Sequence, residues 1–537
     1  MSAAVVCPEP LAAQAGMEIL RKGGNAVDAV IAASLAQGVT DPKMCGIGGH
    51  GRLLIYVRKE NKIVIVDAMS RCGSKALPGI FEYDADSQPE PRVLRPYVVK
   101  NQENDIGYKA VTVPGYMAGI GEAHRHYGKL PWNELFSPAI RLAREGFKVY
   151  NYLVKMGFVE EELPALSATD AARKIYTRNG RPLRVGEVLV QRDYANTLEQ
   201  LSKEGYESFY RGPLAEKIAA DFEKNDGLIT AQDLANYKAT VIEPLRVKYM
   251  DYDVYSDSQP GTGPMKLEAL KILEKVDLKR LEWNTPEYLD VLSRVFQLTM
   301  NDREKYMIDP ESSPTAMTDA EFMISEKHVS EQVAKALNGE TDGPPRPEWA
   351  KDHAIGTSHV TTIDKEGNAV SFCHSIVHSS GVVTEGLGFL YNCHMSVFDP
   401  RPNQRLSMRP GRVPVVSPSP VMIFKKNKLC MSIGSPAGPW GSTAEVQAIL
   451  NVYAFGMTMQ QAVSVPRIHS DIYARTIYVE PSFPSPYPLD NLRAMGHRIV
   501  YSDYGGRLSA ILKNPETEKI EGGADPRGGG GLAYLAS

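Results

Sequence analysis

The chain has 537 residues, of which 43% are hydrophobic and 23% charged, and its formal net charge is −4. This composition is ordinary for a globular protein, and the length predicts two or more lobes or one large layered domain. The negative charge argues against a nucleic-acid-binding surface, and no apolar run approaches the roughly 18 residues that a membrane span requires. We therefore expect neither nucleic acid nor a membrane as a partner.

The amino-terminal residues MSAAVVCPEP contain no basic segment followed by an apolar stretch, so we expect no secretory signal peptide. A cytoplasmic location follows, or a periplasmic or secreted one if a signal has been trimmed. None of the six cysteines forms a CxxC pair or a spaced metal set, which predicts reduced thiols and no zinc.

The first predicted elements are two helices and a hairpin. Residues 10–22 have apolar residues at helical spacing, Gly23-Gly24 should end this helix, and Asn25 can cap a second helix over NAVDAVIAASLAQG. A glycine-rich turn, CGIGGHG (45–51), comes next. RLLIYVRK and KIVIVDA then predict two strands joined near Glu60-Asn61. Residues 84–107, which are polar and contain prolines, predict a surface loop.

The pattern changes twice in the remaining chain. Residues 130–350 predict mostly helix. The proline-rich stretch 338–353, which overlaps the end of this range, should be mobile and exposed. SHVTTID and NAVSFCHS then predict a hairpin around Lys365-Glu366-Gly367, and VMIFKKNKLCMSIG predicts a second one. Helices around 440–455 and 458–464 and strands near 476–480 and 497–502 complete a layered protein with mainly antiparallel sheets.

A candidate nucleophile lies where the polar stretch meets the first strand of the carboxy-terminal part. Thr357 Oγ could attack the carbonyl of Gly356, a residue without Cβ that permits unusual backbone geometry, and water would hydrolyse the resulting ester. The new α-amine of Thr357, with a pKa near ~8, could then serve as general base for its own hydroxyl. A threonine before a strand is more often a cap or a strand residue, so the spacing alone leaves both interpretations open.

Six segments, in the same order over nearly the whole chain, together resemble the γ-glutamyltranspeptidase family. They are EILRKGGNAVDAVIAASLAQGVTDPKMCGIGGHG (18–51), GYKAVTVPGYMAGI (107–120), LITAQDLANYKA (228–239), GTSHVTTIDKEGNAVSF (356–372), GSPAGPWGST (434–443) and GGADPRGGGG (522–531).

The resemblance implies the α+β fold of N-terminal-nucleophile hydrolases, an αββα sandwich with two antiparallel sheets between helical layers. It implies autocatalytic cleavage between Gly356 and Thr357 into a large subunit, 1–356, and a small one, 357–537, which stay associated and can pair as a homodimer of the cleaved unit. It further implies a small-molecule amide substrate and an acyl-enzyme that passes its acyl group to water or an amine. No cofactor and no metal are expected.

The resemblance also assigns the catalytic positions. Thr357 matches the nucleophile, and Ser375 falls where the family has a second threonine whose hydroxyl hydrogen-bonds the nucleophile. Ala437 and Gly438 match paired glycines whose N–H groups form the oxyanion hole, and alanine keeps its N–H. Without the resemblance, GSPAG would be interpreted as a turn that ends a strand.

The substrate-reading positions depart from the family pattern. The arginine that binds the α-carboxylate of a γ-glutamyl group is replaced by Met69, with Arg71 two residues away, and a serine pair is replaced by Val416 and Ser417. The α-amino group of a γ-glutamyl substrate should meet Val377, His394 and Val397, which replace an asparagine, an acidic or amide residue and an aspartate of the family. A buried ammonium facing two valines costs several kcal/mol.

These departures predict an amide hydrolase or acyltransferase with altered γ-glutamyl recognition, acting on a small-acid amide or an N-acyl compound. The loop between Val397 and Val416 also looks too short for a full lid. A genuine γ-glutamyltransferase or glutathione hydrolase that uses Arg71 or Arg412, and a catalytically inactive relative, remain as alternatives.

Two other patterns have weaker support. His359, His374, His378 and His394 could suggest a metal site, but a packed or site-lining role is favoured because no carboxylate partner is evident. The segment 45–51 could suggest a phosphate loop, but a helix precedes it and a strand follows, the reverse of the required order. Gly46, Gly48 and Gly49 are instead expected to let the backbone pack closely under the active site.

Overall fold

The computed structural model describes residues 2–84, 86–87, 98–340, 343–346, 356–416, 420–483, 485–502 and 506–535. Ser417, parts of the predicted loop 84–107 and most of the predicted linker 338–353 lie outside these residues. The chain forms two compact units. The first contains residues 1–243, 355–414 and 528–537, and the second contains residues 244–354 and 415–527.

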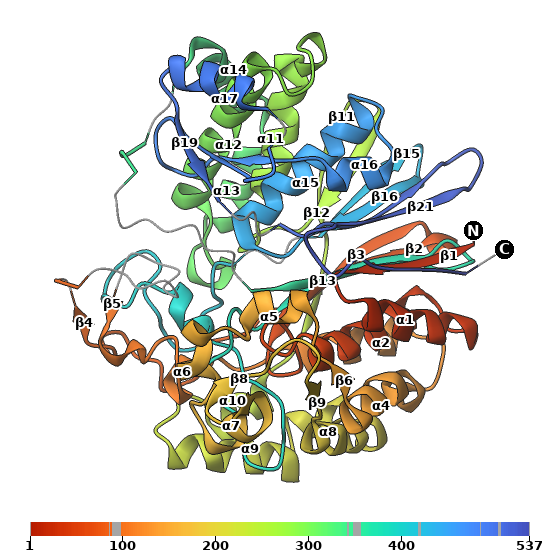
Figure 1. Ribbon diagram of the computed structural model, residues 1–537, viewed down its shortest axis with the longest axis vertical. Helices are drawn as coiled ribbons and strands as arrows, with labels where there is room; N and C mark the ends of the chain where they lie inside the picture. The colour runs from red at the N-terminus through yellow and green to blue at the C-terminus, as the bar shows by residue number, and fades with distance from the viewer. Residues whose placement is uncertain are drawn as a thin grey trace. The chain divides into compact units, whose positions relative to one another are not determined.

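The first unit is built on a seven-stranded sheet in which every neighbouring pair is antiparallel. In spatial order its strands are β10 (Thr240–Ile242), β3 (Lys62–Ala68), β2 (His50–Val57), β14 (Ala369–Ser375), β13 (Ser358–Ile363), β1 (Ala3–Cys7) and β22 (Gly531–Leu535). The pairing of β1 with β22 brings the two ends of the chain side by side (Figure 1).

Strands from before and after the Gly356–Thr357 bond are interleaved in this sheet, with β14 and β13 lying between β2 and β1. β14 pairs with β2, and β13 pairs with β1, so the teal β13 lies among red strands in Figure 1. A cut ahead of Thr357 would therefore leave both pieces hydrogen-bonded within one sheet.

Helices α1 (Pro10–Arg21) and α2 (Ala26–Thr40) pack on this sheet and confirm the first two predicted helices (Figure 1). Asn25 caps α2: its side chain accepts hydrogen bonds from the N–H groups of Val27 and Asp28, and the Asp28 carboxylate completes a capping box. All residues of α2 are buried, which is why most of them are apolar and no polar face is present.

The remaining helices and short strand pairs of the first unit connect these elements. The helices are α3 (Tyr116–Tyr127), α4 (Ser137–Glu145), α5 (Asn151–Gly157), α6 (Leu163–Leu166), α7 (Asp170–Tyr176), α8 (Arg192–Glu204), α9 (Pro213–Lys224) and α10 (Ala231–Asn236). The short pairs are β4 (Tyr83–Asp84) with β5 (Val98–Val99), β6 (Phe147–Lys148) with β9 (Val188–Leu189), and β7 (Thr177–Arg178) with β8 (Arg181–Pro182).

The second unit is built on a six-stranded antiparallel sheet. In spatial order its strands are β11 (Leu245–Tyr249), β12 (Tyr252–Ser256), β15 (Val421–Lys425), β16 (Lys428–Gly434), β20 (Ser509–Lys513) and β21 (Ile520–Ala524). The segment 130–350 is mostly helical, as predicted, and the hairpin of β11 and β12 is an element within it that the prediction did not name. Apolar and charged residues alternate along β11, but the strand is only five residues long and helices flank the hairpin in sequence.

Helices α11 (Gly263–Val276), α15 (Gly438–Tyr453) and α16 (Met459–Ser464) contact this second sheet, and α15 and α16 confirm the helices predicted near 440–455 and 458–464. The other elements of the unit are α12 (Pro286–Tyr306), α13 (Ala316–Met323), α14 (Glu326–Asn338), α17 (Pro486–Ala494), β17 (Ile468–His469), β18 (Thr476–Val479) and β19 (Arg498–Tyr501). β18 and β19 are the strands predicted near 476–480 and 497–502.

Two expectations from composition can be compared with the structure. All six cysteines lie among the described residues, are buried, and form no disulfide. Within the described ranges, no helix is both long and apolar enough to cross a bilayer.

Candidate functional site

The Gly356–Thr357 bond lies at the start of β13, at the end of the sheet where β14 ends with Ser375. Thr357 is 7% exposed, and its hydroxyl contacts the Gly356 carbonyl oxygen. The same hydroxyl donates to Ser375 Oγ at 3.1 Å, and Ser375 Oγ donates to the Gly356 oxygen at 2.8 Å. The structure thus brings together the three residues that the sequence assigned to cleavage and catalysis. Ser375 links the Thr357 hydroxyl to the Gly356 carbonyl.

Close backbone approach explains the glycines of this region. A Cβ on Gly356 would lie 1.7 Å from the Val377 carbonyl oxygen, and one on Gly49 would lie 2.2 Å from the Ser375 carbonyl oxygen. Gly356 is outside the left-handed φ region, so packing, and not an unusual φ, requires glycine there. A Cβ on Gly48 would also clash, 2.3 Å from the Leu390 carbonyl oxygen. The prediction of close packing is confirmed for Gly48 and Gly49 and was wrong for Gly46, where a Cβ would lie 3.6 Å from Gly38 Cα, an ordinary contact.

A pair of stacked histidines lies next to Ser375. His50 is the register partner of Ser375 across β2 and β14, and its ring stacks on His394 with centroids 3.7 Å apart. Ser70 Oγ lies 3.0 Å from His50 Nδ1 and 2.9 Å from His394 Nδ1. Thr112 Oγ1 is 3.3 Å from the same His394 nitrogen. His394 was assigned to substrate binding, whereas His50, Ser70 and Thr112 were not found from the sequence.

Asn392 holds this histidine pair in place. Its Oδ1 accepts from the Thr112 N–H at 3.0 Å and hydroxyl at 2.8 Å, and from the His394 N–H at 3.2 Å. Its Nδ2 donates to the carbonyl oxygens of Gly48 and Thr112. Every polar atom of the buried amide is therefore used, and three distant segments are fixed around one side chain.

Burial keeps these histidines uncharged. It lowers the pKa of His394 to about 3 and holds the pKa of His50 well below 6.5, with the neighbouring His394 and Arg52 adding to the effect at His50. Within the described residues, the Nε2 atoms of His50 and His394 have no hydrogen-bond partner. At neutral pH the pair is apolar on its ring faces and offers neutral nitrogen atoms.

The predicted substrate-reading positions in the first unit are mainly apolar. Val377 has a φ of 64°, a left-handed conformation that is rare for a β-branched residue, and it packs in one apolar cluster with Ala110 and Cys393. Val397 and Met69 are buried, at 5% and 3% exposure. None of these three side chains can pair with an ammonium or a carboxylate.

The two arginines considered as substitutes are engaged with main-chain oxygens. The Arg71 guanidinium donates to the Gly411 carbonyl at 3.3 Å. Arg412 is buried and donates to the carbonyls of Ser407 and Arg405, both at 2.5 Å. These contacts stabilise the loop that follows Val397.

The other histidines of the sequence pattern are dispersed. His359 Nε2 is 2.8 Å from Ser371 Oγ, and His374 Nε2 is 2.9 Å from Gln37 Oε1. β14 ends at Ser375, so the strand periodicity that placed His374 and His378 on one face does not reach His378, and that inference was wrong.

The predicted oxyanion segment belongs to the second unit. β16 ends at Gly434, and α15 begins at Gly438, with Ala437 as its N-cap. Ala437 (φ 83°, ψ 32°) and Gly438 (φ 59°) are both left-handed, and their N–H groups lie at the amino-terminal, positive end of α15. Such a turn is suited to an anionic oxygen. Val416 is partly buried in an irregular segment, and Ser417 lies outside the described residues.

Comparisons with known proteins give the class of this chain. Residues 12–535 match the family model for γ-glutamyltranspeptidase. The glutathione hydrolase proenzyme of Escherichia coli K12 is 30% identical, with 97% of this chain and 90% of that protein aligned. The acylase ACY 1 proenzyme of Pseudomonas sp. V22 is 31% identical, with 95% and 90% aligned. The crystal structure of cephalosporin acylase from Bacillus halodurans superposes with a TM-score of 0.87 at 28% identity, covering 100% of this chain and 96% of that one.

The fold is that of the N-terminal-nucleophile hydrolases, which confirms the predicted α+β class. The chain belongs to the γ-glutamyltranspeptidase family. It is an enzyme of the amidohydrolase and acyltransferase type that this family contains.

Proposed function

We propose that the chain cuts itself between Gly356 and Thr357 and then acts on amides through a threonyl acyl-enzyme. The observation that carries this proposal is the hydrogen-bond chain from the Thr357 hydroxyl through Ser375 to the Gly356 carbonyl oxygen. A nucleophile, its neighbouring hydroxyl and the bond to be cut are in contact in the uncut chain.

In the cleavage step, Thr357 Oγ attacks the Gly356 carbonyl carbon and the C–N bond between the two residues breaks. The hydroxyl proton ends on the Thr357 nitrogen, which becomes an amine, and water then hydrolyses the Gly356 ester to a carboxylate. Ser375 is suited to hold the hydroxyl and the carbonyl at the correct distance during this step.

In turnover, the amine of Thr357 takes the proton of its own hydroxyl as Oγ attacks the amide carbon of a substrate. The leaving amine takes that proton, and an ester between Thr357 and the acyl group remains. Water or a second amine then attacks the ester. By the family resemblance, the N–H groups of Ala437 and Gly438 stabilise the oxyanion.

We further propose that the acyl group need not be γ-glutamyl. Val377 and Val397 are apolar and buried, and His394 is held neutral beside His50, so no charge at these positions compensates a substrate ammonium. A small-acid amide or another N-acyl compound has no ammonium group to desolvate, so its transfer from water into such a site costs less free energy. The names of the ACY 1 acylase and the cephalosporin acylase agree with this class of substrate.

The test is a panel of chromogenic amides offered to the purified, processed chain. Anilides of small dicarboxylic acids and N-acyl β-lactam amides should give kcat/KM values at least about 100-fold above that of γ-glutamyl-p-nitroanilide, which corresponds to ~2.7 kcal/mol of transition-state stabilisation. Equal or faster γ-glutamyl turnover would favour the second candidate, a true glutathione hydrolase, the name that the E. coli relative bears. An uncut chain that turns over nothing would favour an inactive relative.

A gain-of-function variant sharpens the test. Val377→Asn combined with Val397→Asp restores the polar side chains that the family places at these positions, and asparagine tolerates the left-handed φ at 377 better than valine does. The kcat/KM for γ-glutamyl-p-nitroanilide should rise by about tenfold or more. The matched control is the same acyl chain without its amino group, for which the kcat/KM should not rise. A parallel rise for both substrates would contradict the assigned roles.

A further inference from the structure

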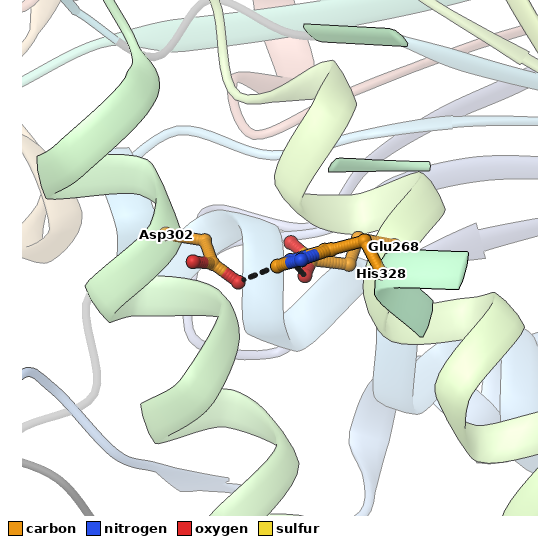
Figure 2. A group of neighbouring side chains, drawn as sticks. All are labelled: Glu268, Asp302 and His328. Carbon is orange, nitrogen blue, oxygen red and sulfur yellow. Dashed lines mark hydrogen bonds and ion pairs between the residues drawn. The ribbon is translucent and has the colours of Figure 1, made fainter. Parts of the chain in front are cut away.

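The second unit contains a polar cluster that plays no part in the proposed reaction. Glu268 on α11, Asp302 on α12 and His328 on α14 converge, as Figure 2 shows. His328 Nε2 lies 2.8 Å from Asp302 Oδ2 and 3.1 Å from Glu268 Oε1. Potential metal-ligand atoms of these three residues all lie within 4.8 Å of one another. Within the described ranges, no other group of three or more His, Cys, Asp or Glu residues meets this criterion.

The three side chains lie inside the protein, with Glu268 0%, His328 5% and Asp302 6% exposed. Gln332, one turn after His328 on α14, joins them: its Nε2 donates to Asp302 Oδ2 at 2.6 Å and lies 3.2 Å from His328 Nε2. Side chains from three helices therefore meet at a single point.

Two oxygen atoms of the cluster lack a partner. Among the described residues, neither Glu268 Oε2 nor Gln332 Oε1 has a hydrogen-bond partner, although both atoms are buried. A buried acceptor left unsatisfied costs about 1–3 kcal/mol. A half-turn of the Gln332 amide exchanges its nitrogen and oxygen, which places Oε1 beside His328 and Asp302.

The ligand atoms of the two buried carboxylates lie within 4.8 Å of each other, and a divalent cation between them would offset their repulsion. A cation would also accept the lone pairs of both unpartnered oxygens. The observed separations of 2.8 and 3.1 Å are close to the ~3.3 Å between ligand atoms of a tetrahedral site with 2.0–2.1 Å bonds.

We infer that Glu268, Asp302, His328 and the amide oxygen of Gln332 bind one divalent ion of the zinc type, which links helices α11, α12 and α14. The imidazole ligand disfavours Mg²⁺ and Ca²⁺, which prefer oxygen donors alone, and the mixed nitrogen and oxygen set suits Zn²⁺. This role is structural and is independent of the proposed amide chemistry.

The test uses the full-length protein, stripped with a chelator and then titrated with ZnCl₂ in a calorimeter. One zinc per chain should bind, and the Tm should rise with zinc concentration because the ion binds only the folded state. Co²⁺ in place of Zn²⁺ should give a visible d–d spectrum. Equal Tm values with and without zinc, together with no bound metal, would overturn the inference. The cluster would then be an ion pair in which His328 donates a proton to the carboxylates.

Variants locate the ion. Asp302→Asn and Glu268→Gln should each weaken zinc binding by at least about tenfold and abolish the zinc-dependent rise in Tm. His497→Gln is the matched control, because His497 is a buried histidine of the same unit that pairs with Asp290 on α12 at 2.7 Å but lies outside the cluster. The control should bind zinc as the wild type does. Zinc binding that survives in both cluster variants would overturn the site, and if one variant fails to fold, the other and the wild-type titration decide.

Discussion

At the scale of single residues, Ser375 is the centre of the candidate site. Its hydroxyl oxygen accepts from Thr357 and from the Val377 N–H at 2.9 Å, and its proton goes to the Gly356 carbonyl. One side chain thus contacts the proposed nucleophile, the carbonyl of the proposed cleavage site and the left-handed turn at Val377.

Ser375→Ala removes these hydrogen bonds and should slow both self-cleavage and amide turnover by about 10- to 100-fold, because a single hydrogen bond contributes about 0.5–1.5 kcal/mol and only part of that is specific to the transition state. Ser375→Thr keeps the hydroxyl and should stay near wild type. Ser371→Ala, on the same buried strand, is the control. Cleavage is followed by denaturing electrophoresis of freshly translated protein. A Ser375→Ala chain that is cut at the wild-type rate would remove Ser375 from the account.

The buried histidines predict a pH dependence of stability. The folded-state pKa of His394 is about 3, far below the ordinary value of 6.5, so between these values the unfolded chain binds more protons than the folded one. The free energy of unfolding should therefore fall as the pH is lowered from about 6.5. His394→Gln removes one such group and should give a shallower slope between pH 6.5 and 5 in urea titrations. Identical slopes would show that the pKa of His394 is the same in the folded and the unfolded chain.

At the scale of elements, the sequence predicts what is locally periodic or capped. α1, α2 with its Asn25 cap, the β2–β3 hairpin and the β13–β14 hairpin were all predictable, because their signals lie within a few consecutive residues. The pairing of β1 between β13 and β22 was not, because it joins residues from three distant parts of the chain.

The residues of the candidate site were likewise predictable only in part. The resemblance supplied Thr357 and Ser375, but the His50–His394 stack depends on side chains from four segments that only the folded chain brings together. His50 had one local signal, its position directly after the glycines 48 and 49 at the start of a strand. Val416 and Ser417 remain predictions.

The turn before α15 makes a prediction about backbone strain. Ala437 is left-handed, a conformation that costs a non-glycine residue about 1 kcal/mol. Ala437→Gly relieves this strain but also makes the unfolded chain more flexible, which offsets part of the gain. The net result should be a rise in the free energy of unfolding of about 0.5–1 kcal/mol. Ala444→Gly, in the buried interior of the same helix, should lower it by about 1 kcal/mol. Urea denaturation measures both changes, and destabilisation by Ala437→Gly would contradict the φ assigned here.

At the scale of the whole molecule, the two expected fragments are intertwined and do not correspond to the two compact units. Each unit contains residues from both sides of Gly356, and in the first sheet two strands of the small fragment lie between strands of the large one. Separating the fragments would break the β1–β13 and β2–β14 pairings and expose the buried core of the first unit.

The fragments should therefore remain together under native conditions. Native mass spectrometry should report a complex of 59.1 kDa or a multiple of it, whereas denaturing electrophoresis should show two bands. Dissociation at neutral pH without denaturant would contradict the interleaved sheet.

The most direct test of the central claim is the intact mass of the purified protein under denaturing conditions, before and after incubation with a slow N-acyl substrate. The account predicts fragments of 356 and 537 − 356 = 181 residues, with the acyl group added to the smaller one. Thr357→Ala should remain a single chain that gains no acyl group. A wild-type chain that stays uncut yet turns over amides, or a Thr357→Ala chain with unchanged turnover, would contradict it.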